Sequence, residues 1–464
     1  MQGLKVDQKE LEKRIKHVVS LSKEIPWYVR KYKELGIDPD EIRSPKDLLK
    51  AYEKGLYTTP QDLPQLVYFK HPEAKGPFYT SGTTGKPKEI WVNPDDHKWL
   101  IPQWGEAFNT ILRRKDKILV CLPKPPAISA HMVCTSLSNY GYNFLHYPSQ
   151  EIGENPPKFV EEYKKIRPNT LISLSTFAYR LPLLLEPLEP QLDRVLIGGE
   201  PTTIERRKRI GDELRGLVYD LYPSSECGLM AVEFEPFTDE HHSLFWYTLP
   251  FLVKDNASVE CNEVGDVILT NLSPLSEKPY MILLNYKIGD WARCVEKEEN
   301  GIVTIMSEIR RYAVPMGGAK LHPEEIEKCV ENLEYRNELT GMYFLVDFKT
   351  VPRKVINTLI QAGIEIDEKL LETLRKDPTT YRNWDRKSEC EIRLESRYAL
   401  PPEKKEEIEE KMREMLYSSN IPLRHLVEII RDARLFIEIK NPGELYKGFR
   451  KLIKPGKTKV YLTI

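Results

Sequence analysis

The most informative segment of this chain is Tyr79-Thr-Ser-Gly-Thr-Thr-Gly-Lys-Pro-Lys88. It combines two glycines and two lysines with a run of hydroxyl side chains. Glycine permits backbone conformations that are closed to other residues, so main-chain N–H groups can converge there on a phosphate. The hydroxyls add neutral donors, and the lysines add positive charge. An ordinary surface turn is the alternative, but this density of matched residues favours phosphate binding by Thr80, Ser81, Gly82, Thr83, Thr84, Gly85, Lys86 and Lys88.

The spacing of this phosphate loop excludes the usual nucleotide-triphosphatase loop. That loop has a longer spacer between its glycines and a Lys-Ser/Thr pair that opens a helix. Here only Thr83 and Thr84 separate the glycines, and Pro87 follows the first lysine. The segment instead resembles the phosphate loop of the adenylate-forming superfamily, which includes acyl-CoA synthetases, peptide-synthetase adenylation domains and luciferases. Glu89 departs from that pattern, because the family usually has glycine at this place.

Composition limits the classes of protein to consider. The 464 residues, 41% of them hydrophobic, can form the cores of two or three domains. The 69 basic and 70 acidic residues leave a net charge of −1, which argues against an electrostatic nucleic-acid binder. No apolar run approaches the roughly 18 residues of a membrane span, and the first residues contain no signal-peptide core. The seven cysteines form no Cys-x-x-Cys pair, so neither zinc nor a disulfide framework is indicated, and we expect a reducing, cytoplasmic setting.

Hydrophobic patterns along the chain alternate between helices and strands. Helices are expected at 8–24, 45–54 and 130–140, and strands at 117–122, 171–174, 194–197, 217–220, 260–269 and 281–286. This alternation predicts an α/β sheet whose ligands bind at the strand ends.

Composition changes after about residue 310, which predicts a domain boundary near Arg310-Arg311. Beyond it, helices are expected at 323–333 and 402–417, strands at 341–348, 390–396 and 435–439, and a helical insertion at about 352–386. The predicted α/β fold has a large N-terminal domain, residues 1–310, of α/β layers with sheets and a small β-rich part. Residues 311–464 are expected to form a small α+β domain, which the family resemblance implies is a lid.

Residues 25–49 indicate which branch of the superfamily the chain resembles. They run from Ile25-Pro-Trp-Tyr to Asp47-Leu-Leu and closely resemble the opening of phenylacetate–coenzyme A ligases. That branch begins with a helix, an x-Pro-Phe-Tyr step and an Ile-x-Ser-x-x-Asp-Leu entry. The match lies outside the nucleotide motifs, so it indicates a branch of the superfamily, and the resemblance implies that the C-terminal domain is mobile.

A Gly-Gly turn follows the strand expected at 194–197, and Thr202 or Thr203 can cap the next helix. An isolated Gly-Gly pair is most often only a turn. This segment, however, resembles the Gly-Glu-Pro element of the phenylacetate ligase branch, which lies beside adenine and the acyl pocket. The resemblance assigns Gly199, Glu200 and Pro201 to the nucleotide and Gly198 to the acyl pocket.

The segment Tyr219-to-Gly228 ends the next expected strand and resembles the Tyr-Gly-x-Ser/Thr-Glu motif. The alignment implies that Tyr222 lies near adenine, Ser225 touches the α-phosphate and Glu226 binds Mg²⁺. A hard divalent cation takes its oxygen ligands from one carboxylate plus phosphates, which suits this role. Pro223 stands where the family more commonly has glycine, and this difference concerns the expected adenine contacts rather than metal binding. Taken alone, the glutamate would be assigned to the solvated surface.

Two further motifs concern the ribose. Tyr286-Lys-Ile-Gly-Asp290 resembles the Tyr-Arg-Thr-Gly-Asp element, whose aspartate accepts both ribose hydroxyls with its two oxygens. The end of the family's hinge pattern matches Gly318-to-Glu327, but residues 307–312 lack its Gly-Arg pair and its aspartate. The resemblance therefore leaves Arg310 or Arg311 as the arginine that contacts the ribose.

The catalytic lysine is expected near the C-terminus. Adenylate-forming enzymes carry it in a Gly-Lys element, where it stabilises charge that develops between carboxylate and α-phosphate. Gly456-Lys457 resembles that element, whereas an ungapped match from Pro442-Gly443 selects Lys451, and a solvated lysine-rich tail is the remaining alternative. We prefer Lys457, because a glycine-flanked turn can project its side chain. Lys88 and Thr84 complete the catalytic set implied by the resemblance.

Together the motifs predict an AMP-forming acid–CoA ligase that uses ATP and Mg²⁺ to make an acyl-adenylate and passes the acyl group to coenzyme A. The branch resemblance suggests an aryl or arylacetic acid in a pocket with His131, Gly198 and Tyr222. The aromatic residues at 241–250 are further candidates for the pocket lining, but they can equally belong to the core. Alternatives are adenylylation of a deazaflavin phenol, acyl transfer to a protein or amine, or a nucleotide-binding homologue that has lost turnover. The oligomeric state, a homodimer included, stays open.

Overall fold

The structure is a computed structural model, and it describes residues 7–79, 89–185, 188–200, 202–244, 247–272, 278–310, 314–316, 319–376, 388–430, 433–452 and 461–463. Contacts between Cα atoms divide the chain into two compact units. The first unit comprises residues 1–200 and 210–311, and the second comprises residues 201–209 and 312–464.

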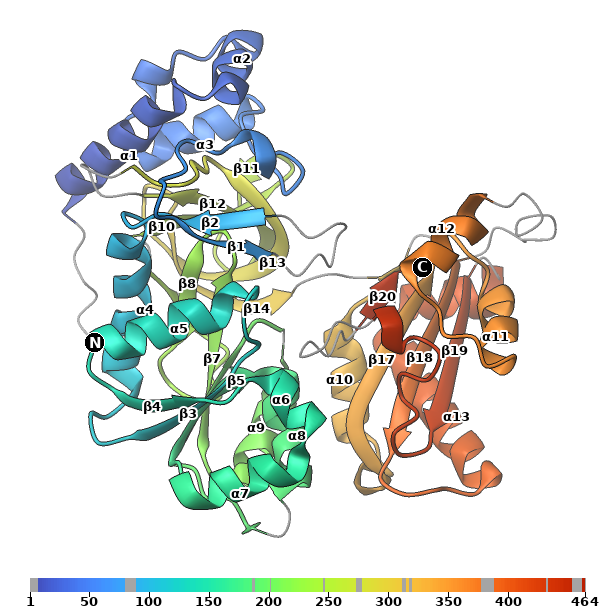
Figure 1. The fold of residues 1–464 in the computed structure, drawn as a ribbon. Helices are drawn as coiled ribbons and strands as arrows, with labels where there is room; N and C mark the ends of the chain where they lie inside the picture. The colour runs from blue at the N-terminus through green and yellow to red at the C-terminus, as the bar shows by residue number, and fades with distance from the viewer. Residues whose placement is uncertain are drawn as a thin grey trace. The chain divides into compact units, whose positions relative to one another are not determined.

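Three helices open the first unit: α1 (Gln8–Ser22), α2 (Pro26–Leu35) and α3 (Pro45–Glu53). Local signals fix their starts. The side chains of Asp7 and Ser44 accept hydrogen bonds from backbone N–H groups in the first turns of α1 and α3, and α2 has proline at its first position. The apolar sides of the helices pack with strands β10 (Thr248–Lys254) and β12 (Val264–Asn271) in one hydrophobic core (Figure 1).

A twelve-stranded sheet crosses the first unit, and one half of it is parallel. The parallel strands lie in the order β4 (Asn143–His146), β3 (Lys117–Cys121), β5 (Thr170–Leu174), β6 (Arg194–Gly198) and β7 (Leu217–Ser224). They are connected by α5 (Ile128–Asn139), α6 (Ser149–Glu154), α7 (Pro156–Ile166), α8 (Ser175–Leu185) and α9 (Ile204–Leu214). The predicted α/β fold is confirmed, and the carboxyl ends of β6 and β7, where ligands bind in such sheets, lie side by side.

The other half of the sheet is antiparallel. It continues from β7 through β8 (Gly228–Glu233), β9 (His241–Ser243), β14 (Val303–Arg310) and β13 (Tyr286–Lys297) to β12, β10 and β11 (Ala257–Ser258). A separate hairpin pairs β1 (Lys75–Tyr79) with β2 (Glu89–Val92).

The strand expected at 281–286 is wrong. Only an isolated bridge pairs Met281 with Val67, and β13 begins at Tyr286. Asn285 interrupts the extended backbone with a φ of 49°, a left-handed conformation that asparagine tolerates better than most residues. Its side-chain amide donates to the carbonyls of Leu48 and Leu56. Contacts with the N-terminal helices therefore override the local apolar pattern.

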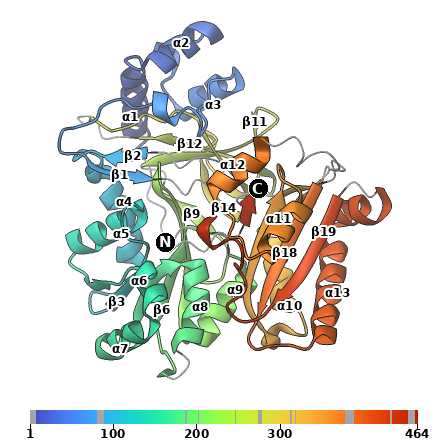
Figure 2. The same ribbon diagram turned by 45° about the vertical axis from the view of Figure 1, so that its right-hand side comes forward.

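Helix α4 (His97–Ile111) and helix α5 cover one face of the parallel strands (Figure 2). Trp104 and Phe108 of α4 and Leu137 of α5 share a hydrophobic core with Ile118 and Val120 of β3. Within the described ranges, no helix has both the length and the apolar composition needed to cross a membrane.

The second unit contains a four-stranded sheet in the order β19 (Ala433–Lys440), β18 (Ser388–Ser396), β17 (Leu339–Phe348) and β20 (Tyr461–Thr463). Its further elements are β15 (Val314–Met316), β16 (Ala319–Leu321), α10 (Pro323–Asn332), α11 (Arg353–Gln361), α12 (Glu368–Lys376), α13 (Pro402–Ser419) and α14 (Ile421–Arg424). Helices α10 and α13 share a core with one face of the sheet. On the other face, Phe344 contacts Phe449, beside which Gly448 approaches Ile360 of α11. The expected insertion thus contributes α11 and α12.

A buried ion-pair network ties the insertion to this sheet. The fully buried Glu391 of β18 accepts hydrogen bonds from Arg393 and from Arg353 of α11, each at 2.5 Å. Arg353 also pairs with Glu438 of β19 at 2.5 Å. Charges removed from water need such partners, because an unpaired buried charge costs several kcal/mol.

Candidate nucleotide and acid site

Part of the predicted site lies outside the described residues. These predictions concern Thr80, Ser81, Gly82, Thr83, Thr84, Gly85, Lys86, Lys88, Pro201, Arg311 and Lys457. Of the alternative lysine, Lys451, the structure describes only the backbone, in a helical turn at 450–452.

The two ends of the phosphate loop are held together by the β1–β2 hairpin, in which Tyr79 pairs with Glu89. Glu89 is the residue that departs from the family pattern, and its carboxylate accepts a hydrogen bond from the indole N–H of Trp91. The Lys70 ammonium lies 3.2 Å from the centroid of the Trp91 ring, a distance at which a cation is attracted to an aromatic face. Glu89 and Trp91 are thus held together at the start of β2, where the chain leaves the loop.

Tyr222 and Asp290, predicted from separate motifs, are in direct contact. The Tyr222 hydroxyl, near the end of β7, donates a hydrogen bond of 2.6 Å to Asp290 Oδ2 on β13. Both residues are buried, with 4% and 7% of their surfaces exposed. A hydrogen bond to a carboxylate is stronger than one between neutral groups and fixes the direction of the acceptor. Tyr222 thus orients Asp290.

Glu226 lies in the turn between β7 and β8 and is contacted by two other strands. The Tyr286 hydroxyl of β13 lies 3.3 Å from Glu226 Oε1, and the Asn271 side-chain amide of β12 lies 3.4 Å from the Glu226 carbonyl oxygen. Burial, followed by the charge of Glu226, raises the pKa of Tyr286, so this tyrosine stays a neutral donor. Ser225 belongs to the same turn. The two predicted motifs at 222–226 and 286–290 are thus joined by two hydrogen bonds.

Gln103 of α4 holds this turn from the opposite side. Its buried amide nitrogen lies 3.4 Å from the Cys227 carbonyl oxygen and 3.4 Å from Thr248 Oγ1. Its amide oxygen accepts from the Leu229 N–H at 3.2 Å. A buried amide with several backbone partners gives a turn one defined position, so Gln103 positions the segment that carries Glu226.

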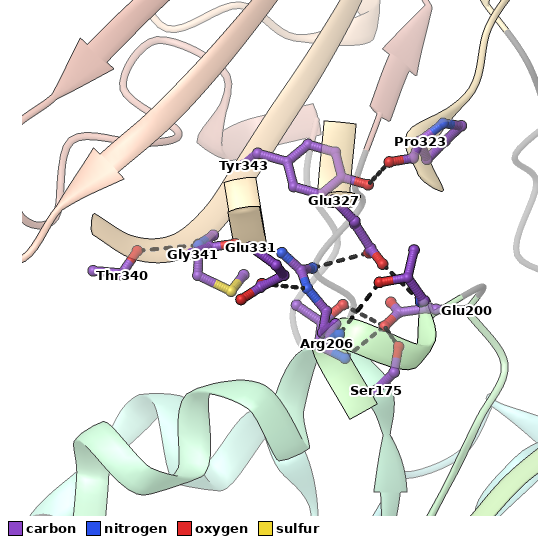
Figure 3. Close-up of polar contacts among 12 residues, drawn as sticks. Ser175, Glu200, Arg206, Pro323, Glu327, Glu331, Thr340, Gly341 and Tyr343 are labelled. Atoms are coloured by element: carbon purple, nitrogen blue, oxygen red, sulfur yellow. Dashed lines mark hydrogen bonds and ion pairs between the residues drawn. The ribbon is translucent and has the colours of Figure 1, made fainter. Parts of the chain in front are cut away.

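Each glycine of the Gly-Gly turn after β6 meets a different structural requirement. A Cβ on Gly198 would lie 2.6 Å from the Leu221 carbonyl oxygen of β7, so only glycine allows the two strands to approach so closely. Gly199 has a φ of +83°, which side chains rarely permit. Glu200 then points at the start of α8, where Oε2 accepts from Ser175 Oγ at 3.2 Å and from the Thr176 N–H at 3.0 Å (Figure 3). A carboxylate is favourable at the positive end of a helix.

Residues 202–209 belong to the second unit, where they anchor the predicted hinge sequence. Thr203 caps α9 by accepting a hydrogen bond from the Arg206 N–H at 3.3 Å. The Arg206 guanidinium pairs with Glu327 at 2.9 Å and with Glu331 at 3.3 Å, and it donates to the Gly341 carbonyl at 2.6 Å (Figure 3). Glu327, the last residue of the hinge match, is therefore a structural anchor in this structure.

His131 forms a pair with a second histidine. Its Nε2 lies 3.1 Å from Nε2 of His97, and its ring stacks on Phe78 with centroids 5.0 Å apart. Burial, followed by His97 and Lys75, lowers the pKa of His131 to about 4. Burial, followed by Lys75, lowers the pKa of His97. Both rings are therefore neutral near pH 7, so one Nε2 donates to the other.

Arg310 closes β14 opposite Trp291, the neighbour of Asp290 on β13. Its guanidinium lies 3.1 Å from Glu308 Oε2, and Glu308 also pairs with Arg293 at 3.0 Å. The strand pairing thus brings the backbone of one candidate ribose arginine next to the predicted ribose aspartate.

Comparison with known proteins places part of the chain in a family. The family model of AMP-binding enzymes matches residues 70–267, the range that includes the phosphate loop, the Gly-Gly turn and Glu226. Residues 70–267 belong to the AMP-binding enzyme family. The predicted adenylate-forming superfamily and the prediction of an enzyme are both confirmed.

Relatives of the chain support the phenylacetate ligase branch. Phenylacetate-coenzyme A ligase from Escherichia coli is 23% identical over 67% of this chain and 72% of its own length. The ligase of the same name from Thermus thermophilus is 24% identical over 60% of this chain and 64% of its own length. A crystal structure of 2-hydroxyisobutyryl-CoA ligase in the postadenylation state has a TM-score of 0.72 at 15% identity, covering 98% of this chain and 89% of that chain. The last likeness is one of fold.

Sequence reasoning missed Gln103, the Tyr286 hydroxyl and His97. Tyr286 opens the motif that ends in Asp290, so its position was a usable signal. Gln103 was detectable only as a polar residue on the apolar side of the helix at 97–111. Nothing in the sequence connects His97 with His131, which lies 34 positions later.

Proposed function

We propose that this protein activates a carboxylic acid with ATP and then transfers the acyl group to coenzyme A. The observation that carries the proposal is the joining of the 222–226 and 286–290 motifs, in which Tyr222 bonds to Asp290 and Tyr286 bonds to Glu226. Tyr222 and Glu226 lie at the carboxyl end of β7, within the range that matches the AMP-binding family, and Tyr286 and Asp290 lie on β13. The names of the curated relatives, which are coenzyme A ligases, support the same activity.

The nucleotide is assigned to residues around this junction. Asp290 accepts the ribose hydroxyls, and Arg310 or Arg311 supports the ribose. Tyr222 and the Gly199-to-Pro201 turn border adenine, Ser225 contacts the α-phosphate, and residues 80–88 bind the other phosphates. Glu226 is the carboxylate that would hold Mg²⁺, and an ion bound there by one carboxylate and the substrate's phosphates would neutralise the charge of the phosphates.

The acid is assigned to a pocket lined by His131, Gly198 and Tyr222, and the proposed class is an aryl or arylacetic acid. The His97–His131 pair supports this class because both rings are neutral, and His131 already stacks on Phe78. A neutral aromatic wall favours an uncharged, planar tail.

The reaction has two displacements. In the first, a carboxylate oxygen of the acid attacks the α-phosphorus, the bond to the β-phosphate oxygen breaks, and pyrophosphate leaves. In the second, the thiol of coenzyme A loses its proton and attacks the acyl carbon, and AMP leaves. Lys457, Lys88 and Thr84 are assigned to charge stabilisation in the first step, because positioning and electrostatics dominate displacement at phosphorus.

Pyrophosphate release with a panel of aryl, arylacetic and short aliphatic acids tests the proposal. Acid-dependent release of pyrophosphate and AMP, with an acyl-CoA product when coenzyme A is present, supports it, and Asp290→Asn should reduce this release. The ligase proposal fails if no acid drives ATP consumption, with or without coenzyme A. Mass spectrometry of the products separates thioester formation from acyl transfer to an amine or protein and from adenylylation of a phenol.

The choice between the two lysines needs its own variants. Lys457→Ala should lower the adenylation rate strongly, while Lys451→Ala serves as the matched control in the same tail. An unchanged rate in Lys457→Ala together with a loss in Lys451→Ala would move the catalytic role to Lys451.

A further inference from the structure

Two cysteines that are 33 positions apart in the sequence meet at the edge of the first unit. Cys294 Sγ, on β13, lies 4.0 Å from Cys261 Sγ, in the turn before β12. Cys294 is buried, whereas Cys261 is exposed. Among the described residues, no other two cysteine sulfurs are in contact, although the chain has seven cysteines.

Backbone hydrogen bonds hold the two residues at this distance. The Asn262 N–H donates to the Cys294 carbonyl at 2.7 Å, and the Cys294 N–H donates to the Glu263 carbonyl at 2.9 Å. The Arg293 guanidinium also donates to the Asn262 carbonyl at 2.6 Å. The two residues that follow Cys261 are thus attached to β13 at Cys294 and Arg293, and these bonds hold the two sulfurs close together.

A disulfide requires sulfurs about 2.05 Å apart and a Cβ–S–S–Cβ dihedral near 90°. The two sulfurs must therefore approach by about 2 Å, which is within the reach of a χ1 rotation between staggered positions. Cys261 is exposed, so its side chain has room to turn.

We propose that Cys261 and Cys294 form a reversible disulfide when the protein meets a low-molecular-weight disulfide such as oxidised glutathione. The Cys261 thiolate attacks one sulfur of the small disulfide, whose S–S bond breaks, and one small thiol leaves. Cys294 then loses its proton to solvent and attacks Cys261 Sγ, which releases the second small thiol. Two protein thiols are oxidised, and one small disulfide is reduced to two thiols.

The different environments of the two thiols set the order of these steps. Burial, together with the neighbouring Cys261, raises the pKa of Cys294 to about 12, so Cys294 is a thiol near pH 7. The exposed Cys261 is the sulfur that an external disulfide can reach, and Cys294 acts second. Disulfides in reducing compartments are usually transient or redox-sensing, which fits a pair that the structure holds as free thiols.

The crosslink would attach the 260–263 turn covalently to β13, the strand that also carries Tyr286 and Asp290. Closing a loop of this length in the unfolded chain lowers its entropy, which stabilises the folded state. For a unit of this size, the expected increase in Tm is roughly 3–6 °C.

The test compares the full-length protein after incubation with oxidised glutathione and after incubation with dithiothreitol. Peptide mass spectrometry without reduction should find the Cys261 and Cys294 peptides linked, with a loss of two hydrogens. The number of thiols that react after denaturation should fall by two from seven, and the oxidised protein should have the higher Tm.

Two variants separate the pair from other thiols. Cys261→Ser should retain all six remaining thiols and show no increase in Tm on oxidation, and Cys134→Ser, a half-buried cysteine outside the pair, should still form the crosslink. A glutathione adduct on Cys261 without the internal link would overturn the proposal, and so would seven unchanged thiols after oxidation of the native protein. None of these measurements depends on the proposed ligase activity.

Discussion

Replacing Tyr222 with phenylalanine tests whether this tyrosine orients Asp290 for a nucleotide. The change removes only the hydroxyl that lies 2.6 Å from Asp290 Oδ2. A hydrogen bond to a charged group contributes about 1.5–3 kcal/mol to stability. Unfolding of a unit of about 300 residues has an entropy of about 0.6 kcal/mol/K. Tyr222→Phe should therefore lower the Tm of the first unit by about 2–5 °C, as measured by scanning calorimetry.

The same variant should bind AMP more weakly. If Asp290 accepts the ribose hydroxyls, loss of its orienting partner should raise the Kd for AMP by about 5–30-fold, equivalent to about 1–2 kcal/mol. Isothermal titration calorimetry with AMP measures this change. Asp290→Asn should weaken binding at least as much, and adding Tyr222→Phe to Asp290→Asn should have little further effect, because both changes disrupt one interaction.

Tyr219→Phe is the matched control, because Tyr219 lies on the same strand and its hydroxyl has no hydrogen-bond partner among the described residues. It should change the Tm by less than about 1 °C, since substitutions that remove no interaction have small effects. Wild-type affinity for AMP in Tyr222→Phe, together with lost binding in Asp290→Asn, would refute the orienting role. A lower Tm with unchanged affinity in both variants would show that the bond serves stability alone.

Buried groups elsewhere in the chain give three further predictions. Gln103→Leu should lower the free energy of unfolding, measured by urea denaturation, by about 2–4 kcal/mol, because backbone groups lose their hydrogen-bond partner. Thr110→Ala, on the exposed side of the same helix, should change this free energy by less than about 0.5 kcal/mol. Burial lowers the pKa of His131 to about 4. As pH decreases from about 6.5 to 4, the unfolded state therefore binds a proton before the folded state does, and Tm should fall. His131→Gln should make Tm depend less steeply on pH over this range. Burial opposes the ionised form of Glu391, but Arg393 and a second arginine lower its pKa overall, so its contribution is present above about pH 4.5 and lost as pH falls through the lower folded value. Glu391→Gln leaves Arg393 without its ion-pair partner and should cost about 3–5 kcal/mol in urea at pH 7.

The sequence predicted most of the fold, because the periods of helices and strands are local properties. The strands expected at 171–174 and 194–197 are β5 and β6, and the alternation around them correctly indicated an α/β sheet. The expectation failed at 281–286, where the run of apolar residues is buried but not extended. Its backbone pairs with the N-terminal segment, as in the hydrogen bond from the Ile282 N–H to the Leu66 carbonyl, and no local pattern reports a partner so distant in the chain.

In the candidate site, the residues themselves could be predicted from local motifs, but the contacts between them could not. Tyr222, Glu226 and Asp290 were found from motifs, but their hydrogen bonds to one another could not be, because Tyr222 and Asp290 are 68 positions apart. Gln103 was missed because its partners lie in the turn before β8 and on β8 and β10, up to 145 positions away.

The superfamily, the α/β class and the order of the nucleotide motifs could be predicted from the sequence alone, since each depends on residues that are neighbours in the chain. The hydrogen bond from Tyr222 to Asp290, the contacts of Gln103 with the turn of Glu226 and the contact of Cys261 with Cys294 arise only in the folded chain. A side chain's partner is set by which strands and helices pack together. That packing is the joint outcome of every buried contact in the unit.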